Sequence, residues 1–140
     1  MELVLSDDEK MVIRFDADEE VFSGLTQFAK NTGLDSVFVS GLGSAKEIEL
    51  GFYDPVKKEY QKTVFREPVE ILSIEGNIGL LDTEAIVHIH GSFGLPNYQV
   101  IGGHIHRLVV SSTVELMLDT MGGELHRSYD EETGLNLLTP

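Results

Sequence analysis

The feature that most constrains this chain is a single change in the spacing of its apolar residues. Between residues 17 and 31 they recur every three to four positions, which is the spacing of one face of an α-helix. The members of this face are Val21, Phe22, Leu25, Phe28 and Ala29. From Ser36 onward, apolar residues alternate with polar ones or form short runs, as in β-strands separated by turns. One helix followed by many strands predicts an α+β fold, with the helix packed on an antiparallel sheet.

Capping residues flank the predicted helix. Asp16 or Asp18 can cap its N-terminus, where a side-chain oxygen accepts free backbone N–H groups. Glu19 and Glu20 would then lie in the first turn, where the helix dipole favours acidic groups. Gly33 can end the helix in a left-handed conformation.

The remainder of the chain is predicted to form strands and tight turns. The strands are Met11–Phe15, Ser36–Ser40, Ile48–Phe52, Lys58–Phe65, Val69–Glu75, Glu84–Phe93, Tyr98–Leu108 and Ser112–Asp119. Gly41–Ser44 is predicted as a turn, in preference to an anion cradle, because a lone Gly-x-Gly is a weak signal. Gly76-Asn77 is predicted to end the strand before it. The 140 residues fit one domain, with a short N-terminal segment 1–10 and a C-terminal tail 121–140 included.

Composition narrows the functional classes. The chain has no cysteine, so disulfides and thiolate metal ligands are excluded, and any transition-metal site must use His, Asp or Glu. The formal net charge is −14, and there is no dense Lys/Arg cluster, which argues against autonomous DNA binding. No signal peptide and no membrane span is recognisable, so we expect a soluble, cytoplasmic protein without a membrane partner.

Four of the five histidines lie in one segment, VHIHGSFGLPNYQVIGGHIHRL. They form two His-x-His pairs, His88/His90 and His104/His106, on two predicted neighbouring strands. Residues two apart on a strand share a face, so each pair shares a face. The pairs could build a metal site, or they could be the polar face of an ordinary hairpin.

The register of the two strands decides between these interpretations. A hairpin centred on Pro96-Asn97 would place His90 opposite Gly103, and His104 would face away. A slip of one residue, or a bulge at Gly102-Gly103, would place His90 opposite His104. With the bulge, all four imidazoles would lie on one face at cross-strand distances suited to metal coordination.

Several motifs together resemble the PPC domain family (plants and prokaryotes conserved, also PCC or DUF296), in its stand-alone prokaryotic type. They are VFVSGLGSAKEIELGFYD from Val37, EILSIEGNI from Glu70, VHIHGSF from Val87 and VIGGHIHRLVVSSTVELML from Val100. The Gly-Gly-His with the downstream Thr-x-Glu is the most specific part. The resemblance covers nearly the whole chain and implies a compact antiparallel sheet with helices on one side, assembling as a homotrimer.

The resemblance also has implications for DNA binding and for metal binding. The "DNA-binding" label of prokaryotic relatives comes by analogy with plant proteins, in which a basic AT-hook precedes the domain, and this sequence has no AT-hook. Prokaryotic members tend to carry histidine at the positions of His88, His90 and His104, which implies these three as the metal ligands. His106 is then a fourth ligand or a neighbour of the site. All-nitrogen ligation favours Zn, with Ni, Cu or Fe as alternatives.

Four further residues are candidates for the pocket around the metal. Glu75 and Glu115 could act as general bases toward metal-bound water, although solvated or subunit-contacting carboxylates are the more common case. Asn77 could be a turn residue or a polar group of the pocket. Arg107 could neutralise an anionic ligand or pair with one of the many acidic side chains. His126 lies in the tail and is expected to be exposed.

Three functions remain open at this point. The leading hypothesis is a binding or regulatory protein, in which a small ligand takes the open metal position; we do not infer catalysis. The second is a metal-dependent hydrolase that uses metal-bound water. The third is a DNA-associated protein, as the family label suggests.

Overall fold

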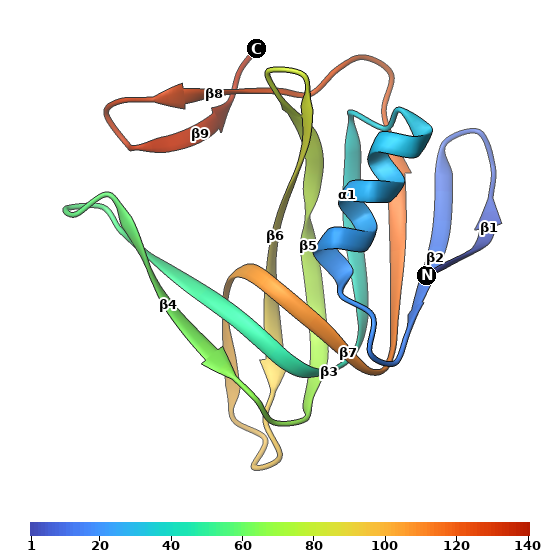
Figure 1. Ribbon diagram of the computed structural model, residues 1–140, viewed down its shortest axis with the longest axis vertical. Helices are drawn as coiled ribbons and strands as arrows, with labels where there is room; N and C mark the ends of the chain where they lie inside the picture. Colours follow the sequence, from blue (N-terminus) through green and yellow to red (C-terminus); the bar gives the residue numbers. More distant parts are fainter.

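The computed structural model describes all 140 residues and contains one helix on a nine-stranded sheet (Figure 1). The elements are β1 (Glu2–Ser6), β2 (Lys10–Asp16), α1 (Val21–Thr32), β3 (Val37–Asp54), β4 (Glu59–Phe65), β5 (Val69–Leu81), β6 (Glu84–Gly94), β7 (Val100–Thr120), β8 (His126–Asp130) and β9 (Leu135–Leu138). The sheet order is β1-β2-β7-β3-β5-β8-β9, while β4 pairs with β3, and β6 pairs with both β5 and β7. All pairings are antiparallel except the short one between β5 and β8, so the predicted α+β class is confirmed.

Helix α1 begins later than predicted. Its N-cap is Glu20, whose carboxylate accepts from two backbone N–H groups of the first turn, so the predicted caps Asp16 and Asp18 are wrong. The segment before Glu20 is instead held to β7, because the N–H of Asp18 donates to the carbonyl of Val110. At the other end, Gly33 adopts φ 66° and caps the helix as predicted. The buried face of α1 consists of Val21, Leu25 and Ala29.

The predicted turn at Gly41–Ser44 is wrong, because these residues lie inside the long strand β3. The register of β3 against β5 shifts between Gly41 and Gly43, and its register against β7 shifts again beyond Gly43. Such irregularities increase the local bend of a strand without ending it. The first half of β3 therefore pairs with β5, and its second half turns away to pair with β4 (Figure 1).

Strand β5 likewise continues through Gly76-Asn77, where the sequence predicted its end. A Cβ atom at Gly76 would overlap the backbone carbonyl of His88 and come within 2.7 Å of the Cα of Ile89. Glycine is thus required here by the close approach of β6 rather than by a turn. A bulge between Ile71 and Ser73 also breaks strict alternation, so that both Ile71 and Ile74 are buried.

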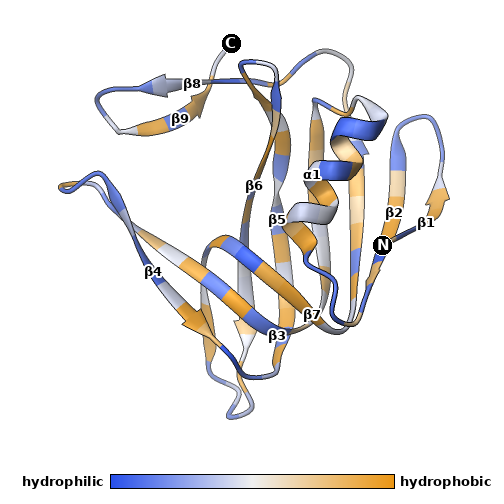
Figure 2. Cartoon of the chain, in the orientation of Figure 1, coloured by the Kyte–Doolittle hydropathy of each residue, from blue (hydrophilic) through white to orange (hydrophobic).

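The C-terminal part differs most from expectation. The two strands predicted at Tyr98–Leu108 and Ser112–Asp119 are one continuous strand, β7. The predicted tail forms a further hairpin of β8 and β9, which was not anticipated. β8 is mostly hydrophilic and β9 mostly hydrophobic (Figure 2). This hairpin and the β3–β4 hairpin extend to the same side of the molecule (Figure 1).

The core lies between α1 and one face of the sheet. It is made of aliphatic side chains and two phenylalanines, Phe15 and Phe93, all nearly inaccessible to solvent. The opposite face carries apolar side chains that are each about half exposed: Phe38, Leu42, Leu72 and Met117. Helix α1 lacks the length and the apolar character needed to cross a membrane.

Replacement of Gly76 by alanine should destabilise the protein by about 1–3 kcal/mol, because β5 and β6 must separate to admit the Cβ atom. The measurement is the free energy of unfolding from denaturant titration. Gly122→Ala is the matched control, since nothing lies within 4 Å of its Cβ position. Equal stabilities for the two variants would contradict the close approach at Gly76.

Candidate metal centre

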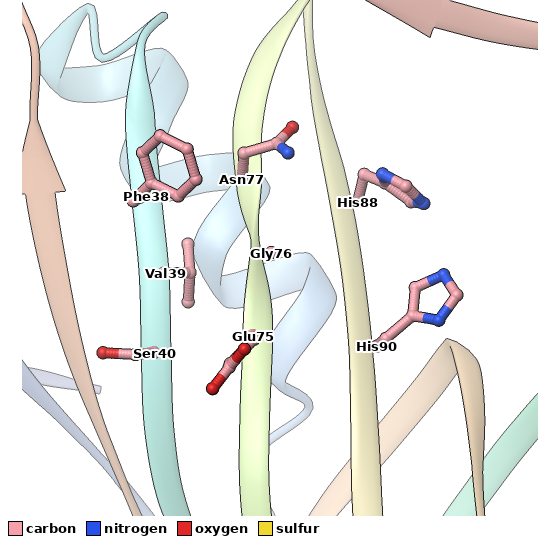
Figure 3. Close-up of a pocket in the computed structure, with 8 residues that line it drawn as sticks. All are labelled: Phe38, Val39, Ser40, Glu75, Gly76, Asn77, His88 and His90. Atoms are coloured by element: carbon pink, nitrogen blue, oxygen red, sulfur yellow. The ribbon is translucent and has the colours of Figure 1, made fainter.

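Two strands bring three histidines to one place. His88 and His90 lie two apart on β6, and their rings project to the same side of the strand (Figure 3). His90 is directly opposite His104 on β7. The sequence left two registers possible, with His90 opposite either Gly103 or His104. The structure has the second, which places His104 on the same face as His90.

The register is set by the hairpin loop rather than by a bulge. The loop spans Leu95–Gln99 and is closed by a backbone hydrogen bond of 2.8 Å from the N–H of Leu95 to the carbonyl of Gln99. The centre of the hairpin is thus Asn97, one residue slipped from the alternative with Pro96-Asn97 at its centre. From Gly94 to His90 the pairing with β7 is regular, so the bulge predicted at Gly102-Gly103 is wrong.

His88, His90 and His104 each offer one ring nitrogen, and these three atoms lie within 4.8 Å of one another. The ring centroids are 5.2 to 5.3 Å apart in all three pairs. A tetrahedral zinc ion at bond lengths of about 2.0–2.1 Å separates its ligand nitrogens by about 3.4 Å. Small side-chain rotations would bring the three nitrogens to that separation.

His106 stands beside this trio and is not part of it. The pairing of β6 with β7 ends at His104, and the ligand atoms that lie within 4.8 Å of one another belong to the other three histidines. The ring of His106 lies 4.6 Å from that of His104 and meets the ring of Tyr60 edge-on at 4.9 Å. The place of His106 is therefore next to the cluster, on the side of β4.

Burial keeps two imidazoles of the cluster neutral, those of His88 and His104. Loss of solvent lowers the pKa of His88 to about 4, assisted by the nearby charges of Arg127 and His90. Loss of solvent also lowers the pKa of His104 to about 3, assisted by the other histidines and Lys62. Metal ions bind the neutral form of histidine, so these two rings are in the ligating state at neutral pH.

One buried atom of the cluster has no partner within the protein. Nδ1 of His104 is buried and has no hydrogen-bond partner in the protein. A buried polar atom without a partner is costly, and a metal ion or a bound ligand would satisfy it. The donor set, three imidazoles without any thiolate, suits zinc, copper, nickel or iron.

Arg127, on β8, contacts the histidine cluster, which the sequence did not reveal. Its Nη2 donates to Oδ1 of Asn77 at 2.8 Å and lies 3.0 Å from Nδ1 of His88. Its Nη1 donates to the backbone carbonyl of Asn136 at 2.9 Å. Asn77 is thus a polar group beside the cluster rather than a turn residue. An arginine in a polar tail gives no sequence signal that it folds back onto a site.

Of the two candidate bases, Glu75 lies beside the imidazole cluster and Glu115 lies apart from it. Glu75, His88 and His90 line one pocket of about 400 Å³. Glu75 is opposite His90 on β5, but its carboxylate points away from both imidazole rings in Figure 3. Its one side-chain partner is Ser73, at 3.4 Å. Glu75 and Glu115 both line a shallow pocket of about 360 Å³ on the open face of the sheet. Neither carboxylate hydrogen-bonds to a histidine of the cluster.

The remaining candidates lie elsewhere. Arg107 is exposed on β7, and its Nε donates to Glu47 at 3.0 Å, so it has the acidic partner that was its alternative assignment. His126 is exposed on β8 and contacts Glu124 at 2.7 Å. Neither residue lines the pocket beside the histidines.

Comparison with known families identifies the chain. The profile of the Plants and Prokaryotes Conserved (PCC) domain family matches residues 4–122. The chain belongs to the PCC family. This confirms the resemblance drawn from the sequence motifs, and it leaves the β8–β9 hairpin outside the matched region of the PCC domain.

Solved PCC-like structures share the whole fold. A provisionally DNA-binding protein from Bacteroides thetaiotaomicron is 26% identical, with a TM-score of 0.93 over 96% of this chain and 94% of that one. A metal-containing protein from Archaeoglobus fulgidus is 29% identical, with a TM-score of 0.87 over 100% and 99% of the two chains. A PPC protein from Pyrococcus horikoshii is 27% identical, with a TM-score of 0.87 over 100% and 98%. Among curated proteins, none matches the sequence.

The buried histidines predict a characteristic pH dependence for the metal-free protein. Histidines of the unfolded chain bind protons at about pH 6.5, whereas His88 and His104 stay neutral in the folded state down to about 4 and 3. The unfolded state therefore takes up more protons below that pH, and the free energy of unfolding should decrease from about pH 6.5 to pH 5. Denaturant titrations after chelation measure this decrease.

The carboxylates do not account for a change in this window, because the shifted ones have pKa values below their ordinary values. The control is the double variant His88→Gln/His104→Gln, in which part of the decrease should disappear. If the free energy of unfolding of this variant depended on pH as it does in the unmodified protein, His88 and His104 would not be buried as neutral imidazoles.

Proposed function

We propose that this PCC protein binds one divalent metal ion, zinc in the first instance, through His88, His90 and His104. The observation that carries the proposal is the convergence of three imidazoles whose ligand atoms lie within 4.8 Å. The unpartnered Nδ1 of His104 and the low pKa values of His88 and His104 support it. The metal-containing relative from Archaeoglobus fulgidus, with the same fold over its whole length, also supports it.

The three nitrogen donors would leave one coordination position of the ion free for a further ligand. Three neutral nitrogen ligands leave the 2+ charge of an ion uncompensated, and a tetrahedral ion retains one position for water or a ligand. His106, beside His104, is a substitute ligand or a neighbour of the site. We therefore propose a binding or regulatory role, in which a small molecule occupies the fourth position.

A hydrolytic role for metal-bound water is the weaker alternative. Such a reaction needs a base within hydrogen-bond reach of the water. Glu75 points away from the imidazoles, and Glu115 lines the pocket on the open face instead. The site as it stands favours binding over catalysis.

Self-association would cover the open face of the sheet. Phe38, Leu42, Leu72 and Met117 lie on that face and are each about half exposed. Leu42, Leu72 and Met117 line one pocket on this face. Exposed apolar side chains gathered on one face are typical of a subunit contact. We propose a homotrimer, the assembly implied by the family resemblance, with the open face as its contact surface.

Metal analysis of protein purified without a His-tag tests the proposed site. The unmodified chain should carry about one ion per chain, and His104→Gln should lose most of it because two ligands rarely hold an ion. His126→Gln is the matched control, since this histidine is exposed and contacts only Glu124. An unmodified protein with far less than one ion per chain would rule the proposal out.

DNA association, suggested by the description of the relative from Bacteroides thetaiotaomicron, is a second candidate. The formal charge of −14 opposes it, because affinity for DNA comes mainly from cationic side chains that neutralise phosphates. We expect no retention of duplex DNA by micromolar protein at physiological salt. Retention that weakens as salt is added would reverse this expectation.

A further inference from the structure

Arg127 differs from the other arginines of the chain in having no acidic partner. Arg14 pairs with Glu2 and Asp16, while Arg66 and Arg107 both pair with Glu47. Arg127 bonds only to neutral acceptors: a side-chain amide, a backbone carbonyl and an imidazole nitrogen. In a chain with 24 acidic residues, none of them reaches this cation.

The guanidinium of Arg127 is also partly removed from water. Burial lowers its pKa from the ordinary value, and its Nε is buried without any hydrogen-bond partner. A desolvated cation is stable only when its charge and its N–H groups are compensated. The protein supplies part of the hydrogen bonds and none of the negative charge.

A pocket lies between Arg127 and the histidine cluster. It has a volume of about 260 Å³ and is lined by His88, His104, Arg127, Tyr60 and aliphatic side chains of β6 and β9, among them Ile86 and Leu137. The β8–β9 hairpin covers one side of this pocket, through Arg127, Leu135, Asn136 and Leu137. The tip of this hairpin is tied to the β3–β4 hairpin, because Lys58 donates to the carbonyl of Glu131 at 2.6 Å and Tyr53 to that of Thr133.

Arg127 and a metal ion compete for the same lone pair of His88. A neutral imidazole has one N–H and one acceptor nitrogen, and arginine can only donate, so Nδ1 is the acceptor where it faces Nη2. An ion bound at Nδ1 takes this lone pair directly. An ion bound at Nε2 places the proton on Nδ1. In both cases Arg127 loses His88 as an acceptor and stands as an unpaired cation beside a second cation.

We infer that the metal-loaded site takes a small organic carboxylate, whose anionic end pairs with Arg127 beside the open metal position and whose apolar end lies against Ile86 and Leu137. The inference rests on the proposed metal site and names the class of its ligand. The carboxylate restores an acceptor to Nη2 and separates the charge of Arg127 from that of the ion. Because each then stabilises the other, the anion and the metal ion should bind cooperatively.

The lining favours a monoanionic carboxylate over a phosphate. Arg127 is the only cationic side chain of the pocket, and most of the remaining wall is aliphatic or aromatic. A single guanidinium matches the two oxygens of a carboxylate, whereas the largely apolar wall offers few donors to the further oxygens of a phosphate. The net charge of −14 further disfavours anions of higher charge.

Calorimetric titration of the zinc-loaded protein with isovalerate tests the inference, with the zinc content measured on the same samples. Isovalerate should bind, and the uncharged isovaleramide should bind at least about tenfold more weakly, because it lacks the charge that pairs with Arg127. Arg127→Gln should retain its zinc and lose at least about tenfold in isovalerate affinity. Arg107→Gln, which removes a cation paired with Glu47 outside the pocket, is the matched control and should bind as the unmodified protein does.

The possible outcomes distinguish failure of the carboxylate assignment from failure of the proposed metal site. Full zinc occupancy without isovalerate binding, equal binding of acid and amide, or unchanged binding in Arg127→Gln would overturn the carboxylate assignment alone. Inorganic phosphate binding more tightly than isovalerate would do the same. Absence of zinc from the unmodified protein would overturn the metal site and the inference with it. The comparison of acid with amide uses only the unmodified chain, so it holds even where a variant fails to fold.

Discussion

The register of β6 against β7 is the constraint on which the histidine cluster depends. The five residues of the Leu95–Gln99 loop set Gly94 opposite Val100, and regular pairing then carries His90 to its place opposite His104. A slip of one residue would turn His104 to the other face, because side chains alternate along a strand. The buried Phe93, fixed in the core close to the loop, resists such a slip, since it would be moved to the solvent face.

Electrostatics then determines the protonation state of the histidines in the cluster. Three imidazoles, Arg127 and the nearby Lys62 lie close together, and no carboxylate hydrogen-bonds to the three rings. Two acidic side chains lie nearby: Glu75 lines a pocket with His88 and His90, and Glu49 pairs with Lys62 at 3.2 Å. Protonation of His88 and His104 is opposed both by desolvation and by neighbouring positive charges. The site presents lone pairs to a cation and one guanidinium to an anion, which is the polarity expected of a metal with an anionic ligand.

The sequence predicted the helix, most strands, the α+β class and the four histidines on neighbouring strands, because these follow from local periodicity. It failed where tertiary contact overrides local preference. Gly76 resembles a strand end, but the close backbone of β6 is what requires a glycine. Gly41–Ser44 resembles a turn, but it bends a continuous strand. Arg127 could not be found, because its partners Asn77 and His88 lie 50 and 39 residues away and no periodicity connects them.

The site combines residues inside the segment that matches the PCC family with residues that follow this segment. The histidines belong to strands within the region that matches the PCC domain, whereas Arg127 and the apolar wall of β9 lie beyond residue 122. The proposed metal ligands and the arginine proposed to bind the anion thus lie in different segments of the chain. A change in the β8–β9 hairpin would alter the charge and shape of the pocket without moving an imidazole. For the proposed site, this separation means that substitutions in the hairpin would change which anions bind while the same three imidazoles hold the ion.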